Sequence, residues 1–144
     1  MKDKEQQIER GRRIVQHMYA NDPFSQWLGI EIKEVQLGRV ILKMEVREEM
    51  TNGFGIAHGG ISYSLTDSAL AFASNTYGPQ AVSIETSVAH THPVRTGDRL
   101  IATAEEEHRS RRIGRYRIEI KNQSDETVAL FRGTVFIKER EWDI

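Results

Sequence analysis

The sequence predicts an α+β fold in which an antiparallel sheet curls around one long central helix. Three observations lead to this prediction. Two strand-like runs come before residue 50, a run that is apolar around most of a helical circumference extends from about residue 59 to 77, and four more strand-like runs follow it. At 144 residues the chain is long enough for one domain with a single hydrophobic core.

The first expected element is an amphipathic helix from residue 3 to about 20. Its apolar residues recur at helical spacing between charged ones, at Ile8, Ile14, Val15 and Met18. The segment "ANDPFS" ends this helix, because Asn, Asp and Pro favour turns, and it begins a short turn that holds Phe24 and Trp27.

The strands alternate β-branched residues with charged ones. "GIEIKEVQ" and "RVILKMEV", on either side of Gly38, predict a hairpin, and a glycine-bearing loop follows at residues 48–57. A Gly-Pro pair closes the central helix, after which come "QAVSIETSVAHTH", "DRLIATAEEEHRS", "IGRYRIEIKNQ" and "TVALFRGTVFIKE". Ile118 and Ile120 alternate with charged neighbours, as in a sheet with one solvated face. Four other large apolar residues are expected in the core: Met44, Met50, Phe131 and Phe136.

The composition excludes several classes of function. The 20 basic and 21 acidic side chains leave the chain near neutrality, so we expect no nucleic-acid partner and no membrane partner. The absence of cysteine excludes disulfides, thiolate metal sites and a cysteine nucleophile. The start "MKDKEQQIERGRR" is too charged for a signal peptide, and no apolar run approaches the ~20 residues of a membrane span. We therefore expect a soluble cytoplasmic protein.

The segment "NGFGIAHGGISYSLTDSALAFASN" carries the candidate chemistry. His58, Gly59 and Gly60 lead into the central helix, and two glycines there let another molecule approach the backbone closely. The N–H groups of a first helical turn lack partners within the helix, and the helix dipole adds partial positive charge. Such a turn suits a developing oxyanion. Asp67 adds a carboxylate in the middle of the same helix.

These two features cannot meet within one chain. Helical rise places Gly59 and Asp67 about 12 Å apart, and His58 and Asp67 about 14 Å apart. Nine steps of about 100° also turn His58 and Asp67 to opposite faces. If both act on one substrate, they must come from two copies of the protein, so function predicts a homodimer with two shared sites.

Simpler interpretations exist for each feature taken singly. Glycine pairs occur in many turns, and His58 could bond only to the backbone. An aspartate on a helix usually faces solvent, and Ser64, Thr66 and Ser68 could form a polar stripe with Asp67.

The stretch "HGGISYSLTDSALAFASN" resembles the segment that identifies the hotdog-fold acyl-CoA thioesterases, in their PaaI-like branch, named for phenylacetate degradation. The similarity covers about residues 38–136. It implies that the Gly59 N–H binds the thioester carbonyl, that His58 shapes the turn, and that Asn52 orients the water or the carboxylate. Asp67 would be the general base or the nucleophile that forms an acyl-aspartyl anhydride, and both roles use the ionised form.

The resemblance also implies a substrate, acyl-CoA, with aryl-acetyl groups such as phenylacetyl or hydroxyphenylacetyl favoured. No cofactor and no metal are needed, and relatives of this kind pack as homotetramers. Gly60 belongs to the substrate-binding turn. Some relatives carry a serine or threonine one turn after the carboxylate, where this chain has Leu70 and Ala71, so that helper is absent or replaced by Ser68.

The segment "HRSRRIGRYR" concentrates arginines at a predicted hairpin turn. Such charge is often only solvated surface. The functional interpretation is that Ser110, Arg111 and Arg112, with Arg95, bind the phosphates of coenzyme A, because guanidinium groups bind phosphate bidentately.

Three alternatives remain open. His90 and His92 share one face of a predicted strand where many relatives have apolar or aromatic residues, and with His108 they could form a metal site. The chain could also be a non-enzymatic acyl-CoA-binding hotdog domain, although it carries no DNA-binding segment. A hotdog hydratase or dehydratase is less favoured, because we find no matching pair of histidine and acid on the helix.

Overall fold

The computed structural model describes residues 1–144 and contains three α-helices and six strands. The helices are α1 (Lys2–Ala20), α2 (Pro23–Leu28) and α3 (Gly59–Ser74), and a short 3-10 helix spans Glu48–Met50. The strands are β1 (Glu31–Gln36), β2 (Arg39–Glu45), β3 (Pro79–His90), β4 (Arg99–Arg109), β5 (Ile113–Lys121) and β6 (Thr127–Glu141).

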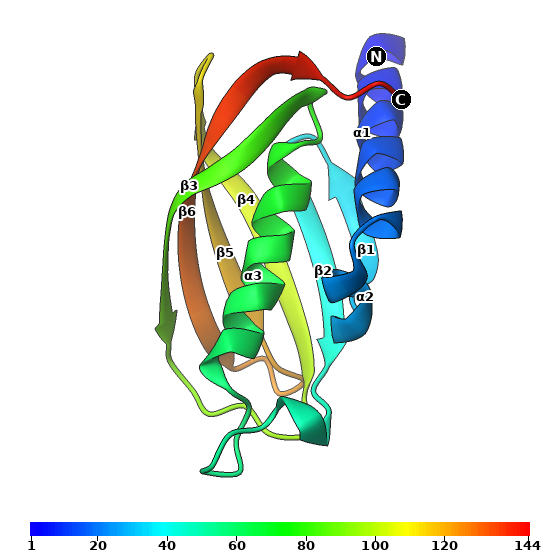
Figure 1. Ribbon diagram of the computed structural model, residues 1–144. Coiled ribbons are helices and arrows are strands. Elements are labelled where there is room, and N and C mark those ends of the chain that lie inside the picture. The colour runs from blue at the N-terminus through cyan, green and yellow to red at the C-terminus, as the bar shows by residue number, and fades with distance from the viewer.

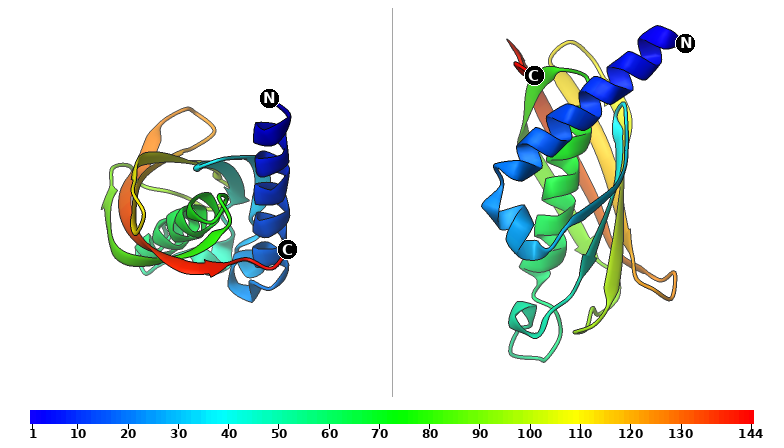
Figure 2. Two further views of the ribbon diagram at one scale, coloured as in Figure 1. Left: turned by 90° about the horizontal axis from the view of Figure 1, so that it is seen from above. Right: turned by 90° about the vertical axis from the view of Figure 1, so that its right-hand side faces the viewer.

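The strands form one antiparallel sheet in the order β1-β2-β4-β5-β6-β3. The sheet curls around α3, while α1 lies outside the curl, on the side of β1 and β2 (Figures 1 and 2). The predicted fold class is confirmed, and the arrangement is that of a hotdog fold. None of the helices combines the length and the apolar character needed to cross a membrane.

Local interactions set the ends of the helices. Asp22 caps α2 by accepting a hydrogen bond from the Ser25 N–H at 2.9 Å, with Pro23 at the first helical position. The central helix ends at Ser74 and not at residue 77 as predicted. Asn75 is its C-cap residue, and the side chain of Asn75 makes hydrogen bonds that take the place of the next helical turn. Its amide donates to the Ala71 carbonyl at 2.8 Å and accepts from the Ala81 N–H at 2.9 Å, which joins the helix end to β3.

The core lies between α3 and the concave face of the sheet. Leu65, Ala69 and Phe72 of α3 are buried there, and the close approach of the helix requires glycine on β6, where a Cβ at position 133 would lie 2.6 Å from Leu70 Cδ2. Three of the four predicted core residues are buried, but Phe136 is 40% exposed. Its neighbours Val135 and Ile137 face inward, so alternation along β6 turns Phe136 outward.

The C-terminal segment connects α1 with the end of α3 through hydrogen bonds. Trp142 Nε1 donates to Asn75 Oδ1 at 2.8 Å, and Arg10 donates to the Trp142 carbonyl at 3.0 Å. Both chain ends consequently lie at the same end of the molecule (Figure 1).

On the β3 side of the hotdog, two neighbouring surfaces are uncovered. β3 is an edge of the sheet, with one side paired to β6, and its Val82 and Ile84 are 44% and 58% exposed. Beside it, α3 keeps one stripe that the sheet does not bury: Gly60 and Asp67 are exposed and Ser64 and Ala71 are partly exposed. The spacing of four, three and four residues places these side chains on one helical face.

Candidate active site

The turn at the start of α3 has one free donor that points away from the helix. His58 caps the helix, and its Nδ1 accepts a hydrogen bond from the Gly60 N–H at 3.0 Å, while the Ile61 N–H donates to the His58 carbonyl at 2.9 Å. The Gly59 N–H has no such partner, and as the first residue of the helix it has none in the helical ladder. The turn therefore offers the Gly59 N–H to a ligand, with the helix dipole behind it.

The hydrogen bond from the Gly60 N–H to His58 leaves Gly60 without a free N–H for a substrate. The sequence suggested that Gly60 contributes to substrate binding, but its N–H is engaged by His58. Nδ1 of His58 is the acceptor in this hydrogen bond, so Nε2 is the ring nitrogen left to act as a donor. Gly60 lacks a side chain and keeps the surface of the helix open.

Asp67 lies on the exposed stripe of α3, in the middle of the helix. Partial burial raises the pKa of its carboxyl, and the nearby charge of Asp22 raises it further. A raised pKa makes the ionised carboxylate a stronger proton acceptor. The sequence interpretation did not require this shift.

Asn52 lies in the loop before the turn and is partly buried. Its Oδ1 accepts a hydrogen bond from the Phe54 N–H at 2.9 Å, and its own N–H donates to the Ile56 carbonyl at 2.8 Å. Its Nδ2 remains available as a donor. Asn52 thus belongs to the same end of α3 as Gly59, because an isolated bridge between Thr51 and Ala57 closes the loop.

Ser68 does not share the exposed stripe with Asp67. It is 8% exposed, and its Oγ lies 2.7 Å from the Ser25 Oγ of α2. The Ser25 hydroxyl in turn donates to Asp22 at 2.5 Å. Ser68 therefore anchors α2 on the central helix, and in this arrangement its hydroxyl is not directed toward a substrate on the exposed stripe.

The predicted phosphate-binding residues divide between the two ends of the hotdog. Ser110, Arg111 and Arg112 form the β4–β5 turn, and the Arg112 carbonyl accepts from the Ile137 N–H at 2.8 Å, beside the start of β3. Arg95 lies at the other end, near the turn of His58, since the adjacent Val94 carbonyl accepts from the Ala57 N–H at 2.6 Å.

An open cleft of about 450 Å³ adjoins the β4–β5 turn. Four cations line it, Arg109, Arg111, Arg112 and Lys138, against one acid, Glu139. Glu139 lies 3.6 Å from Arg111 and also pairs with Arg112. The sequence interpretation noted Arg109 in the arginine-rich segment without giving it a binding role, and it missed Lys138, because β6, which is distant in sequence, brings Lys138 to the turn.

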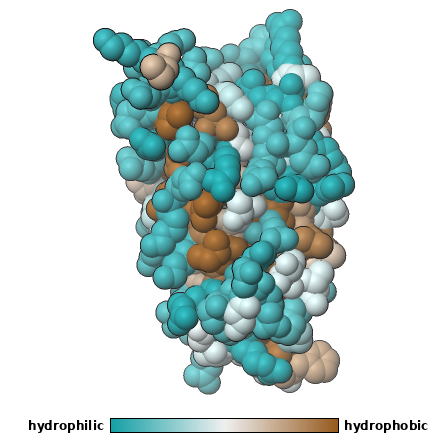
Figure 3. Space-filling view, turned by 180° about the vertical axis from the view of Figure 1, so that it is seen from behind, coloured by the Kyte–Doolittle hydropathy of each residue, from teal (hydrophilic) through white to brown (hydrophobic).

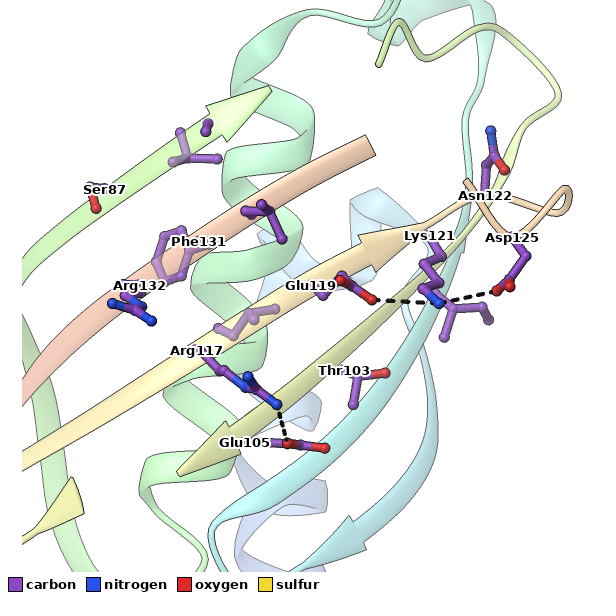
Figure 4. Close-up of a pocket in the computed structure, with 15 residues that line it drawn as sticks. Ser87, Thr103, Glu105, Arg117, Glu119, Lys121, Asn122, Asp125, Phe131 and Arg132 are labelled. Atoms are coloured by element: carbon purple, nitrogen blue, oxygen red, sulfur yellow. Dashed lines mark hydrogen bonds and ion pairs between the residues drawn. The ribbon is translucent and has the colours of Figure 1, made fainter. Parts of the chain in front are cut away.

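A larger groove of about 880 Å³ lies on the outer face of the sheet, where apolar side chains appear between charged ones (Figure 3). Its charges are paired within the chain: Arg117 with Glu105 at 3.3 Å, and Lys121 with Asp125 at 3.3 Å (Figure 4). None of the candidate catalytic residues lines this groove. It is therefore separate from the candidate active site.

The histidines do not form the metal cluster considered from the sequence. β3 ends at His90, so alternation no longer places His92 on the same face, and the two rings face different partners. His90 lies against Gly59, whereas His92 Nε2 lies 3.3 Å from Glu126. No group of three or more histidine and acidic side chains is arranged to hold a metal ion.

Comparisons with known proteins agree with this geometry. The family model of the thioesterase superfamily matches residues 54–129, which include the turn and Asp67. The acyl-coenzyme A thioesterase PaaI of Escherichia coli is 42% identical over 116 residues, which cover 81% of this chain and 83% of that protein.

Two further relatives extend the match. A putative esterase of Archaeoglobus fulgidus is 35% identical over 133 residues, covering 92% of this chain and 84% of its own. The structure of the E. coli PaaI protein, from the phenylacetic acid degradation operon, superposes with a TM-score of 0.91 and 36% identity, covering 93% of this chain and 97% of that chain. The chain therefore belongs to the thioesterase superfamily, as a PaaI-like hotdog protein, and is a thioester hydrolase.

Proposed function

We propose that this chain hydrolyses acyl-CoA in a homodimer whose two sites each combine Asp67 of one chain with the partner's Gly59 and the partner's Asn52. The observation that carries the proposal is the exposed stripe of α3. A free N–H stands at the start of the helix, a carboxylate stands midway along it, and helical geometry keeps the two about 12 Å apart within one chain.

Two uncovered surfaces support antiparallel pairing of two chains. The stripe of Gly60, Ser64, Asp67 and Ala71 is made of small residues apart from the carboxylate, so a second α3 can approach it closely. The free edge of β3 offers unpaired N–H and C=O groups along 12 residues, and such an edge readily pairs with another strand. A two-fold axis beside both features brings the partner's turn toward Asp67 and creates two equal sites.

The chemistry follows from these positions. The partner's Gly59 N–H binds the carbonyl oxygen, water adds to the carbonyl carbon, and Asp67 takes a proton from the water. Collapse of the tetrahedral intermediate re-forms the carbonyl and expels the CoA thiolate, which takes up the proton. In the alternative route Asp67 attacks the carbonyl, expels the thiolate as an anhydride forms, and water then hydrolyses the anhydride. The partner's Asn52 orients the water or the carboxylate through its free Nδ2.

The nucleotide end of CoA binds at the basic cleft. Dimerisation brings the partner's Arg95, which makes no ion pair within its own chain, toward the end of the molecule that carries Ser110, Arg111 and Arg112. The phosphates of CoA displace Glu139 from its arginines, because a phosphate offers several acceptor oxygens to guanidinium groups.

The acyl group is proposed to be an aryl-acetyl group, phenylacetyl or hydroxyphenylacetyl. The support is the similarity to E. coli PaaI, whose structure is described as that of a protein from the phenylacetic acid degradation operon. No cofactor and no metal take part in the proposed steps. A homotetramer needs a second interface, which we place at the outer groove, where Leu130 is exposed.

The test is thiol release from a panel of acyl-CoAs, which a thiol reagent reports without background because the chain has no cysteine. We expect turnover of aryl-acetyl substrates by the wild type, and Asp67→Ala to abolish turnover while substrate binding remains. Asp3→Ala, at an exposed acid on α1, is the matched control and keeps full activity. Binding without turnover in the wild type would instead favour a ligand-binding hotdog domain.

A further inference from the structure

We propose that His90 supplies a second hydrogen-bond donor to the thioester carbonyl oxygen, beside the Gly59 N–H of the same chain. This inference rests on the proposed function, and it gives a role to a residue whose function the sequence left open. The mechanism above has one donor at the oxyanion. The structure places an imidazole next to it.

The position of the ring is specific. The point where a Cβ at residue 59 would lie is 3.1 Å from His90 Nε2, 3.5 Å from Cε1 and 3.7 Å from Cδ2. The distal edge of the imidazole, with Nε2 foremost, is therefore turned toward the backbone of Gly59. A side chain at position 59 would fill the space between them, so glycine at this position also gives the imidazole access to the turn.

The two donors are close enough to share one oxygen. A Cβ lies about 2.5 Å from the N of its own residue, so Gly59 N and His90 Nε2 are separated by about 5.6 Å at most. Two N–H···O hydrogen bonds of about 2.9 Å to a single oxygen span up to about 5.8 Å. The separation of the two nitrogens is therefore short enough for one oxygen to lie within hydrogen-bonding distance of both.

The ring nitrogens of His90 have no partner within the chain. The other histidine near the end of the strand, His92, is paired with Glu126, whereas the side chain of His90 makes no hydrogen bond or ion pair within the chain. Its Nε2 is free to donate, either as neutral imidazole with the proton on that nitrogen or as imidazolium. Since β3 pairs with β6 up to the contact of His90 with Ala129, the backbone that carries the ring is held in the sheet.

The chemistry requires no proton transfer by His90. As water adds to the carbonyl carbon, the carbonyl electron pair moves to the oxygen, and both N–H groups bind the resulting oxyanion. When the intermediate collapses, the pair returns and the thiolate leaves. A donor that strengthens its hydrogen bond as charge develops lowers the barrier and has little effect on substrate binding.

The first test is the substitution His90→Phe, which keeps an aromatic ring over Gly59 and removes the donor. We expect kcat to fall about 10- to 100-fold with KM nearly unchanged, and His90→Gln, which restores an N–H donor, to recover part of the loss. His92→Phe is the matched control and should retain wild-type kinetics. A kcat for His90→Phe within about threefold of the wild type would overturn the proposal.

The second test separates a catalytic donor from a structural ring. A trifluoromethyl ketone analogue of an acyl-CoA becomes tetrahedral at the carbonyl carbon, whereas a CoA thioether lacks the carbonyl. His90→Phe should weaken binding of the ketone by the same factor as kcat and leave binding of the thioether unchanged. Equal losses for both analogues would assign His90 to packing and refute the inference.

Failure of this inference is distinguishable from failure of the proposed function. If Asp67→Ala abolishes turnover and His90→Phe does not lower it, only the role of His90 is wrong. If Asp67→Ala retains turnover, the assignment of the site itself is wrong, whatever His90 does.

Discussion

The shared active site can be tested by mixing two inactive variants. Gly59→Pro removes the one free N–H at the start of α3 and leaves the helix in place, because proline suits the first helical position. His58, at φ −59° and ψ 137°, already has the extended backbone that a residue before proline adopts. Gly59→Ala is its matched control, since it adds the same Cβ next to His90 and keeps the N–H. Asp67→Ala removes the carboxylate from the other half of the site.

The expected recovery can be calculated. Random pairing of equal amounts of the two variants gives half of all dimers as mixed dimers, and each mixed dimer carries one site with both defects and one intact site. One quarter of all sites are then active, about 25% of wild-type activity. Loss of one oxyanion donor lowers kcat by about 10²–10³, so the mixture should exceed the Gly59→Pro parent by about 25-fold or more.

The assay is thiol release after the two variants are unfolded together and refolded at varied ratios. If f is the fraction of one variant, activity should follow f(1 − f), with its maximum at equal amounts. Gly59→Ala mixed with Asp67→Ala provides the comparison in which one chain retains the donor. Activity in the Gly59→Pro mixture that equals the weighted mean of the two parents at every ratio would show that both groups act within one chain, and the geometric reasoning would be refuted.

The remaining predictions concern stability and CoA binding. The pKa of Asp67 in the folded state is raised above the ordinary value of about 3.9, so the folded protein binds the carboxyl proton more tightly than the unfolded chain does. The free energy of unfolding of the wild type therefore falls as pH rises from the unfolded-state pKa to the folded-state pKa. Asp67→Asn should therefore raise Tm by at most a few degrees at pH 7 and have no such effect at about pH 3, and a difference independent of pH would contradict this. Trp142→Phe removes the hydrogen bond to the end of α3 and should lower the free energy of unfolding by about 1 kcal/mol, measured by denaturant titration. Arg112→Ala and Arg95→Ala should each raise KM for acyl-CoA about tenfold with kcat retained, whereas Arg117→Ala, on the outer groove, should change neither.

The fold could be predicted because its strands carry a local signal. Alternation with a period of two and turns at glycine, proline and short polar segments located all six strands to within about two residues, with β3 and β6 as examples. The errors arose where a distant partner decided the outcome. Asn75 ends the central helix through a hydrogen bond to β3, and Phe136 faces outward because its neighbours fill the core.

The candidate site was predictable only in part, for the same reason. The turn and Asp67 lie on one helix, so helical geometry alone separates them. Contacts between distant segments decided two of the remaining features: the Ser68 hydroxyl lies against Ser25, and the His90 ring lies against Gly59. The third, the hydrogen bond from the Gly60 N–H to His58, is a local helix cap whose geometry the sequence does not specify. No local pattern reports that a strand end will lie against a helix start, and the roles of the site residues stay predictions until the variants are measured.

The features that lower the stability of a single chain are the same features that the proposed chemistry uses. A carboxylate whose pKa is raised by burial, a helix stripe without a cover and an N–H without a partner each leave a folded chain less stable than it could be. A sequence selected for stability alone would place an uncharged residue at position 67 and a side chain at position 59. Catalysis needs a charged residue at position 67 and no side chain at position 59. The carboxylate must accept a proton, and the N–H must stay unpaired until it binds the oxyanion. Pairing of two chains across the stripe and β3 can compensate for the uncovered surfaces while leaving both groups to the substrate, which is why assembly and activity are expected to depend on the same interface.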